Sequence, residues 1–218
     1  MINLKTYISV GLIVLFVALA ILLILVILFI VFYPKLKKAK FEKDYVSIYG
    51  KKIYQYALHN DLYLINELEF KANDDQTLRV NHLLFGTKYI YLITDYFLPG
   101  TVEAKFNDRS FIYTSLDKNP KKVYIDNLFL SSDSLTKKVA SNLGLNSNLF
   151  IPLSIVDNNC DFGNLKLNVG DNYIVHIAEF KKLIDSLESR NVAPLNDNQL
   201  KYTVKDVNRL NERRKERK

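Results

Sequence analysis

The feature that most constrains this chain of 218 residues is a long uncharged apolar run near its N-terminus. No charged side chain occurs between Lys5 and Lys35, and residues 7–33 are almost all Ile, Leu, Val, Phe and Ala. A membrane-spanning helix needs about 20 apolar residues to cross a hydrocarbon core about 30 Å thick. A core helix of this length would show a polar face, and this run has none. We therefore expect residues 1–33 to form a single transmembrane anchor.

A cleaved signal peptide is the alternative, but its apolar region is about 7–15 residues long and ends in small residues. The run here is longer and ends in the bulky segment Phe29–Tyr33. Only Lys5 precedes the run. The lysines that follow it closely are Lys35, Lys37, Lys38, Lys40 and Lys43. Because positive charge stays on the cytoplasmic side of a span, we expect a single-pass cell-membrane protein with its N-terminus outside and its soluble domain in the cytoplasm.

The rest of the chain divides into three parts by composition. We interpret residues 34–44 as a basic linker, 45–190 as one folded domain, and 191–218 as a C-terminal helix with a basic tail. The net charge of +7 would favour an anionic membrane surface or a nucleic acid, although a solvated lysine-rich surface explains it equally well. The single cysteine, Cys160, cannot form an internal disulfide, which fits a reducing compartment.

Apolar periodicity in the soluble part predicts a helix, then hairpin-linked strands, then mixed helices and strands. Expected helices cover residues 46–60, 119–143 with a possible interruption near Ser131-Ser132, 176–189, and a last stretch from Asn196-Asp197. Expected strands cover residues 62–70, 80–85, 89–97, 101–106, 110–114, 150–156 and part of 165–175. A polar turn is expected at 71–76, and the short turn 86–88 predicts antiparallel pairing of the strands around it. This order predicts an α/β or α+β fold with helices flanking a mixed sheet.

The segment Val80–Gly86 (VNHLLFG) resembles the most distinctive stretch of the nuclease-related domain (NERD) family, which belongs to the PD-(D/E)XK nuclease superfamily. In that family, an Ile-Asp-His strand with three hydrophobic residues and a glycine leads into a strand that ends in Glu-x-Lys. A helix opened by Asn-Pro follows. Here Tyr89–Ile93 corresponds to the second strand, and Asn119-Pro120 to the start of the helix. The resemblance covers about residues 46–190 and implies a restriction-endonuclease-like fold.

The family's acidic residues hold Mg²⁺, which activates water, and its lysine stabilises the developing negative charge. The resemblance places Asn81 at the Asp position, Thr94 at the Glu position and Tyr96 at the Lys position. A further acid usual on the first helix is also missing, because no Asp or Glu occurs between Asp44 and Asp61. A Mg²⁺ site without carboxylates would be weak. We therefore expect a neutral cluster of Asn81, Thr94 and Tyr96, with no bound metal or cofactor and no nuclease activity.

A rearranged site is the alternative. Glu103-Ala104-Lys105 is itself a Glu-x-Lys triplet, and Asp95 lies across the Pro-Gly turn from it. Asp95, Glu103 and Lys105 would then bind Mg²⁺ and support nuclease activity. Such triplets are common by chance, however, and alternating charges on a strand usually mark its solvated face. His82, beside the former metal position, has no paired ligand in the sequence and fits a structural hydrogen-bonding role.

Four lysines are candidates for contacts with nucleic-acid phosphates from one helix: Lys121, Lys122, Lys137 and Lys138. A solvated helix face is the other interpretation of these residues. The leading hypothesis is a membrane-tethered, catalytically degenerate module that binds DNA, RNA or a protein partner. The alternatives are the rearranged Mg²⁺-dependent nuclease and a structural membrane adaptor whose last helix docks a partner.

Overall fold

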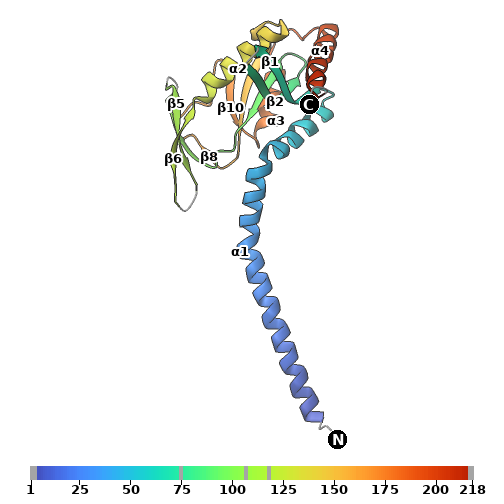
Figure 1. The fold of residues 1–218 in the computed structure, drawn as a ribbon, viewed down its shortest axis with the longest axis vertical. Helices are drawn as coiled ribbons and strands as arrows, with labels where there is room; N and C mark the ends of the chain where they lie inside the picture. The colour runs from blue at the N-terminus through green and yellow to red at the C-terminus, as the bar shows by residue number, and fades with distance from the viewer. Residues whose placement is uncertain (1–3, 74–75, 106–107, 117–118, 216–218) are drawn as a thin grey trace. The chain divides into compact units, whose positions relative to one another are not determined.

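The computed structural model of this chain describes residues 4–73, 76–105, 108–116 and 119–215 (Figure 1). The chain forms two compact units, Met1–Tyr45 and Val46–Lys218. Helix α1 (Leu4–His59) contributes to both units, so residues 34–44 are helical. The fold is mixed α/β, as the order of periodic segments predicts.

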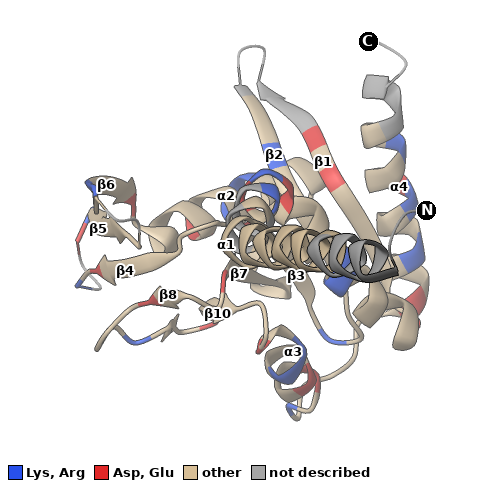
Figure 2. Ribbon diagram, turned by 90° about the horizontal axis from the view of Figure 1, so that it is seen from below, with Lys and Arg blue, Asp and Glu red and all other residues tan. Residues whose placement is uncertain are grey.

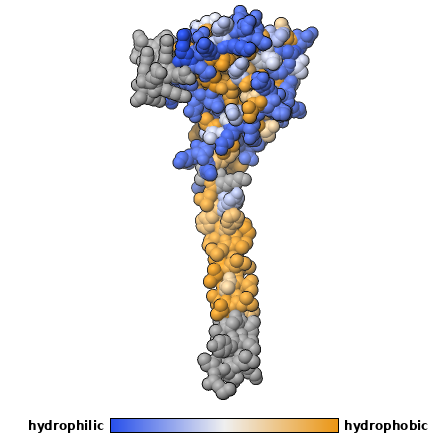
Figure 3. Space-filling model, turned by 90° about the vertical axis from the view of Figure 1, so that its right-hand side faces the viewer, coloured by the Kyte–Doolittle hydropathy of each residue, from blue (hydrophilic) through white to orange (hydrophobic). Residues whose placement is uncertain are grey.

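The first unit contains the apolar part of α1. Val14–Tyr33 has a mean hydropathy of 3.7, and none of its most apolar window is buried inside the protein. On the face that Figure 3 shows, apolar side chains cover this stretch. The prediction of one continuous apolar helix is confirmed over the described residues. Its length and composition suffice to cross a membrane, and a signal sequence near an N-terminus has the same properties.

The second unit is built on a six-stranded sheet with the order β1-β2-β3-β7-β10-β9. Strands β1, β2 and β3 are successively antiparallel, whereas β7 runs parallel to both β3 and β10. The predicted antiparallel pairing across the 86–88 turn is therefore confirmed. The strands are β1 (Tyr63–Asn73), β2 (Gln76–Phe85), β3 (Ile90–Asp95), β7 (Phe150–Val156), β9 (Asn168–Val169) and β10 (Asn172–His176).

A second sheet has four strands in the order β6-β5-β4-β8, with β6 at one edge. Its strands are β4 (Gly100–Glu103), β5 (Ser110–Ser115), β6 (Lys122–Asp126) and β8 (Cys160–Asp161). One core cluster joins this sheet to the start of α2 and to β7. We call it the second-sheet core, and its buried members are Leu98, Val102, Phe111, Leu128, Phe129, Val156, Cys160, Phe162 and Ile174.

Helices cover both faces of the first sheet. Val139 of α2 (Leu128–Leu143) and Val207 of α4 (Asp197–Lys215) are buried in one cluster with Leu92 of β3. Tyr91, the neighbour of Leu92, points to the opposite face, because its hydroxyl donates to Glu188 at the end of α3 (Phe180–Glu188). The last turns of α1 lie on that face too, since the ring of Tyr56 packs edge-on against Phe180 of α3. A short 3-10 helix, η1 (Ser147–Leu149), leads from α2 into β7.

The predicted helix start at Asn119-Pro120 is wrong. Residues 122–126 form strand β6, in which Val123, Tyr124 and Ile125 are strong strand formers. Helix α2 instead follows Asn127, whose side chain accepts hydrogen bonds from the backbone of Phe129 and Leu130. Asn127 is thus the N-cap. The predicted stop is confirmed, because Gly144 adopts a left-handed conformation with φ 63 at the C-cap.

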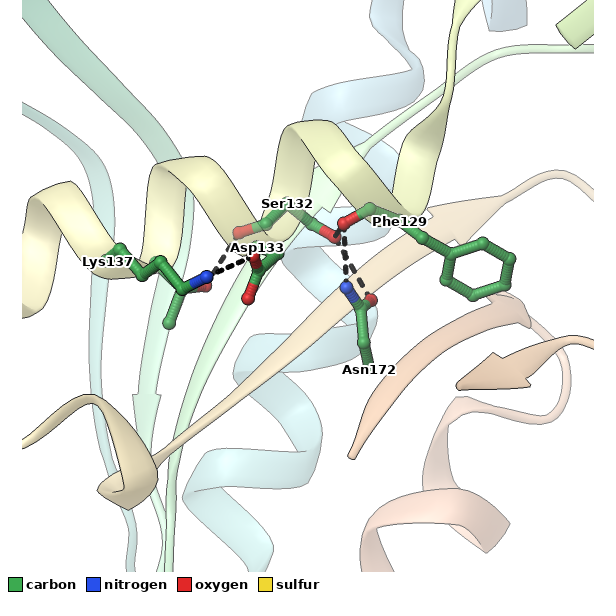
Figure 4. Close-up of polar contacts among 6 residues, drawn as sticks. Phe129, Ser132, Asp133, Lys137 and Asn172 are labelled. Atoms are coloured by element: carbon green, nitrogen blue, oxygen red, sulfur yellow. Dashed lines mark hydrogen bonds and ion pairs between the residues drawn. The ribbon is translucent and has the colours of Figure 1, made fainter. Parts of the chain in front are cut away.

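The possible interruption near Ser131-Ser132 is absent, because α2 is continuous there. Figure 4 shows Ser132 between the helix backbone and β10. Its hydroxyl bonds to the carbonyl of Phe129 at 3.1 Å and to the side chain of Asn172 at 3.0 Å. Asn172 in turn donates to the same carbonyl, so the serine fastens α2 to the sheet.

Two further boundaries differ from the sequence predictions. The segment expected as a polar turn at 71–76 is largely strand, since β1 extends to Asn73 and β2 begins at Gln76. Residues 74–75 lie outside the described residues. The helix expected from His176 begins at Phe180, because His176 is still paired with Val156 in the sheet.

Candidate functional site

The predicted site positions lie where β2 and β3 stop pairing. The last pair of the β2–β3 ladder is His82 with Ile93. Beyond it, the side-chain oxygen of Asn81 accepts a hydrogen bond from the backbone N–H of Asp95 at 3.1 Å. The asparagine side chain therefore continues the connection between the two strands where the backbone ladder ends.

An irregularity in β1 and β2 sets which side chains face the site. Glu67 has a left-handed backbone with φ 53, and it is skipped in the pairing of β1 with β2. Ile65 and Leu68 both belong to the core cluster shared with α2 and α4, although side chains in a regular strand alternate with a period of two. Val80 and Leu83 of β2 show the same spacing of three. The twist at Glu67 thus turns residues 66–67 of β1 and 81–82 of β2 away from this core cluster, toward the opposite face of the sheet.

His82 and Asp95 form a buried pair on that other face. Nε2 of His82 lies 2.7 Å from Oδ2 of Asp95, and the two side chains are 2% and 0% exposed. Nδ1 of His82 lies 2.8 Å from the side-chain oxygen of Asn66 on β1. Gly50 of α1 packs against the Cε1 edge of the imidazole, because a Cβ at position 50 would lie 3.1 Å from Cε1 of His82. The network therefore ties three strands and one helix together.

The partners of the imidazole define where its protons sit. Nδ1 faces an amide oxygen, which only accepts, so Nδ1 carries a proton. Nε2 makes the second hydrogen bond of the ring, to the carboxylate of Asp95 at 2.7 Å. Burial raises the pKa of the Asp95 carboxyl, and the hydrogen bond to His82 offsets part of that rise. The second carboxylate oxygen, Oδ1, is buried without a hydrogen-bond partner in the described part of the chain.

Thr94 and Tyr96 flank Asp95 and turn to the face opposite its carboxylate. Thr94 pairs in register with Ser154 of β7, and both hydroxyls are buried without a hydrogen-bond partner among the residues the structure describes. The ring of Tyr96 packs against the second-sheet core. Its backbone N–H continues the pairing with β7 by donating to Ile155. The expected Glu and Lys positions are thus occupied by side chains that pack into the fold.

The residues of the rearranged alternative are distributed over two sheets. Asp95 is buried on β3, whereas Glu103 lies on β4 with a side chain that is 63% exposed. Glu103 lies 3.9 Å from Lys122, and the backbone of Lys105 donates to Asp108. Within the described ranges, no three His, Cys, Asp or Glu side chains gather as a metal ion would require.

The four candidate lysines do not share a helix, which corrects the sequence interpretation. Lys121 precedes β6 and Lys122 is on it, whereas Lys137 and Lys138 are on α2. Two of the four lie beside acidic side chains: Lys137 is 2.7 Å from Asp133, and Lys122 is near Glu103. Figure 2 shows basic and acidic residues interspersed along the second unit rather than separated.

Sequence reasoning missed a second polar cluster around the β2–β3 turn. The carboxylate of Glu188 accepts hydrogen bonds from the hydroxyl and backbone N–H of Thr87 and from the backbone of Lys88. It also accepts one from the hydroxyl of Tyr91 at 2.5 Å. Gly86 allows this approach, because a Cβ there would lie 2.2 Å from the Glu188 carboxylate. The partners are about a hundred residues apart in the chain, so no local pattern could have indicated them.

Comparison with known proteins gives no family for this chain. It matches no protein-family model, no curated protein and no solved structure. The resemblance to the nuclease-related domain therefore rests on the Val80–Gly86 segment and stays a prediction. What the structure establishes is a mixed α/β fold with two sheets and one N-terminal apolar helix.

Proposed function

We propose that this protein is a membrane-anchored binding module, a degenerate form of the nuclease-related domain whose soluble part faces the cytoplasm. The anchor is the apolar stretch Val14–Tyr33, and the lysines after it set the orientation. The soluble part binds a macromolecular partner without cleaving it.

The observation that carries this proposal is that the side chains of Asn81 and Asp95 make hydrogen bonds inside the domain. A nuclease of the resembled superfamily needs carboxylates that face both Mg²⁺ and water. Here the amide of Asn81 binds the backbone of Asp95, and the carboxylate of Asp95 is closed off by His82. Both side chains hold β2 to β3, which supports a structural role for the region that would be catalytic in the family.

A protein partner suits the surface better than a nucleic acid. Affinity for a nucleic acid comes mainly from basic side chains that replace the counterions around phosphates. Lys122 and Lys137 have acidic neighbours, Glu103 and Asp133, which reduce the positive field each would offer to a phosphate backbone. Interspersed charges of both signs are instead suited to a partner with a mixed surface.

The decisive experiment measures cleavage and binding with the purified full chain in detergent. Plasmid DNA, linear DNA and RNA would be incubated with Mg²⁺ or Mn²⁺, and we expect no products above a chain-free control. Cleavage that is abolished by Asp95→Ala or Glu103→Ala, but kept by exposed-site control Asp133→Ala, would establish the rearranged nuclease instead.

Nucleic-acid binding is measured separately by gel retardation over a salt series. We expect no retardation at physiological salt. Retardation that weakens steeply with salt, and that is reduced by Lys121→Ala, Lys122→Ala, Lys137→Ala or Lys138→Ala, would make nucleic acid the partner.

A further inference from the structure

Strand β6 presents an open edge with exposed apolar side chains. It pairs with β5 and ends the second sheet, and Figure 1 shows it at the margin of the ribbon. Tyr124 is 79% exposed and Val123 is 44% exposed. An edge strand of this kind is a template for another strand, because its outer backbone groups have no ladder partner.

The pairing with β5 shows which backbone groups of β6 point outward. The N–H of Ser115 bonds to the carbonyl of Lys121, and the N–H of Asn127 bonds to the carbonyl of Arg109. In an antiparallel ladder, residues alternate between pairs that exchange hydrogen bonds and pairs that do not. The odd-numbered residues of β6 therefore bond to β5. The residues whose N–H and C=O point away from β5 are Lys122, Tyr124 and Asp126.

The sequence of β6, Lys-Val-Tyr-Ile-Asp, is complementary to itself in the antiparallel direction. We propose that β6 pairs with β6 of a second copy of this chain, about a twofold axis at Tyr124. In this register Tyr124 faces Tyr124, and Lys122 faces Asp126 of the second copy on both sides of the axis. Val123 faces Ile125, so charged and apolar side chains each meet a suitable neighbour.

The same register is the one that the backbone allows. Lys122, Tyr124 and Asp126 are the residues whose backbone N–H and C=O point away from β5. In this register each of them faces another of the three in the second copy, so each pair exchanges hydrogen bonds. A shift by one residue would set outward groups against groups already bonded to β5. A shift by two would place Lys122 opposite Tyr124 and leave Asp126 without its opposite charge.

The charge pattern argues for a second copy over an unrelated strand. Lysine on an edge strand normally discourages pairing, because an apolar partner strand cannot accommodate the charge. Lys122 lies on the same face of the sheet as Glu103, 3.9 Å away, and the proposed register adds Asp126 of the second copy. An isologous contact of this kind closes after two subunits and does not propagate into a filament.

Charge reversal in the full chain, purified in detergent, tests the proposal by light scattering and sedimentation. Lys122→Glu sets Glu against Asp126, and Asp126→Lys sets Lys against Lys122. We expect each variant alone to weaken self-association about tenfold or more. An equal mixture of the two variants restores opposite charges at both positions, so it should associate as tightly as the wild type.

Restoration in the mixture excludes misfolding as the cause of the single-variant losses. A wild-type chain that is monomeric at all accessible concentrations would overturn the proposal. So would single variants that associate like the wild type, or a mixture that stays monomeric.

Cysteine cross-linking tests the register itself. Residues that face each other as a hydrogen-bonded pair have Cα atoms about 5.5 Å apart, which a disulfide can bridge. A chain with Lys122→Cys should cross-link to a chain with Asp126→Cys after mild oxidation. The yield of this mixed dimer should be well above the yield of the Lys122→Cys chain cross-linked to itself. Tyr202→Cys, on the exposed face of α4, is the matched control, and the buried Cys160 should not react. Equal yields for all of these pairs would overturn the proposed register.

Discussion

Nε2 of His82 lies 2.7 Å from the carboxylate of Asp95, and neither side chain has appreciable contact with solvent. Gly50 of α1 packs against Cε1 of the same imidazole. The carboxylate of Asp95, the acidic group nearest to the expected metal position, is therefore buried between a helix and a sheet. Substitutions in this buried cluster should therefore change the stability of the protein. Stability can be measured without knowing the binding partner.

Replacement of Asp95 by Asn should change how stability depends on pH. Burial raises the pKa of Asp95 in the folded state above its ordinary value of 3.8, despite the opposing effect of His82. A raised carboxyl pKa makes the folded chain bind more protons than the unfolded chain, so this contribution to stability is lost as pH rises through the folded pKa. The stability of the wild type relative to Asp95→Asn should therefore fall as pH increases above about 3.8, in urea unfolding at several pH values. A stability difference that stays constant with pH would contradict this prediction.

Replacement of Gly50 by Ala should destabilise the fold, although alanine is the better helix former. A Cβ at position 50 would lie 3.1 Å from Cε1 of His82, which is held by its bonds to Asp95 and Asn66. We expect a loss of about 1 kcal/mol from this overpacking. In a His82→Ala background the same change should instead gain up to about 1 kcal/mol from helix propensity. A stabilising effect in both backgrounds would show that the imidazole moves aside easily.

The sequence was sufficient to predict elements that rest on local patterns. The β2–β3 hairpin follows from two apolar strands around a short turn, and the end of α2 follows from Gly144. The start of α2 was misplaced because Asn119-Pro120 has the same local signal as a true cap. Asn127 is the actual cap, and strand pairing with β5 decides that residues 122–126 are not helical.

The polar networks could not have been predicted, because their partners are distant in the sequence. His82 has no neighbour in the chain that identifies Asp95 as its partner, and Gly50 contacts it from another element. The left-handed backbone of Glu67 is equally hidden, since Glu rarely adopts that conformation. Such features are fixed by packing and not by the local pattern.

Replacement of Glu67 by Gly should stabilise the protein. A φ of 53 is sterically unfavourable for a residue with a Cβ, whereas glycine adopts it without this steric penalty. We expect a gain of about 0.5–1 kcal/mol in chemical denaturation. Glu69→Gly, two residues along the same strand and 3.0 Å from Arg79, is the matched control and should lose stability. Equal losses for both variants would show that the twist at Glu67 depends on its side chain.

Removal of residues 1–34 should release the protein from membranes. The full chain carries the exposed apolar stretch Val14–Tyr33, and we expect it to remain in the membrane pellet after alkaline extraction. The intact mass of the pelleted protein should include residues 1–33, whereas a cleaved signal sequence would leave a shorter chain. Protease added outside intact cells should spare residues 46–218, and their digestion would reverse the proposed orientation.

Replacement of Glu188 by Ala should loosen the β2–β3 turn. The carboxylate accepts hydrogen bonds from both the hydroxyl and the backbone of Thr87, from the backbone of Lys88, and from Tyr91. Alanine offers no acceptor, so all of these donors lose their partner, and we expect a loss of about 1–3 kcal/mol.

Tyr91→Phe, which removes a single donor, is the matched control and should cost about 1 kcal/mol. The double variant should cost less than the sum of the two, because both changes break the bond between Tyr91 and Glu188. Hydrogen exchange should report faster opening of the 86–88 turn in Glu188→Ala, since the backbone N–H groups of Thr87 and Lys88 lose their acceptor. Unchanged exchange at these two amides, together with strictly additive losses, would show that α3 does not hold the turn through this carboxylate.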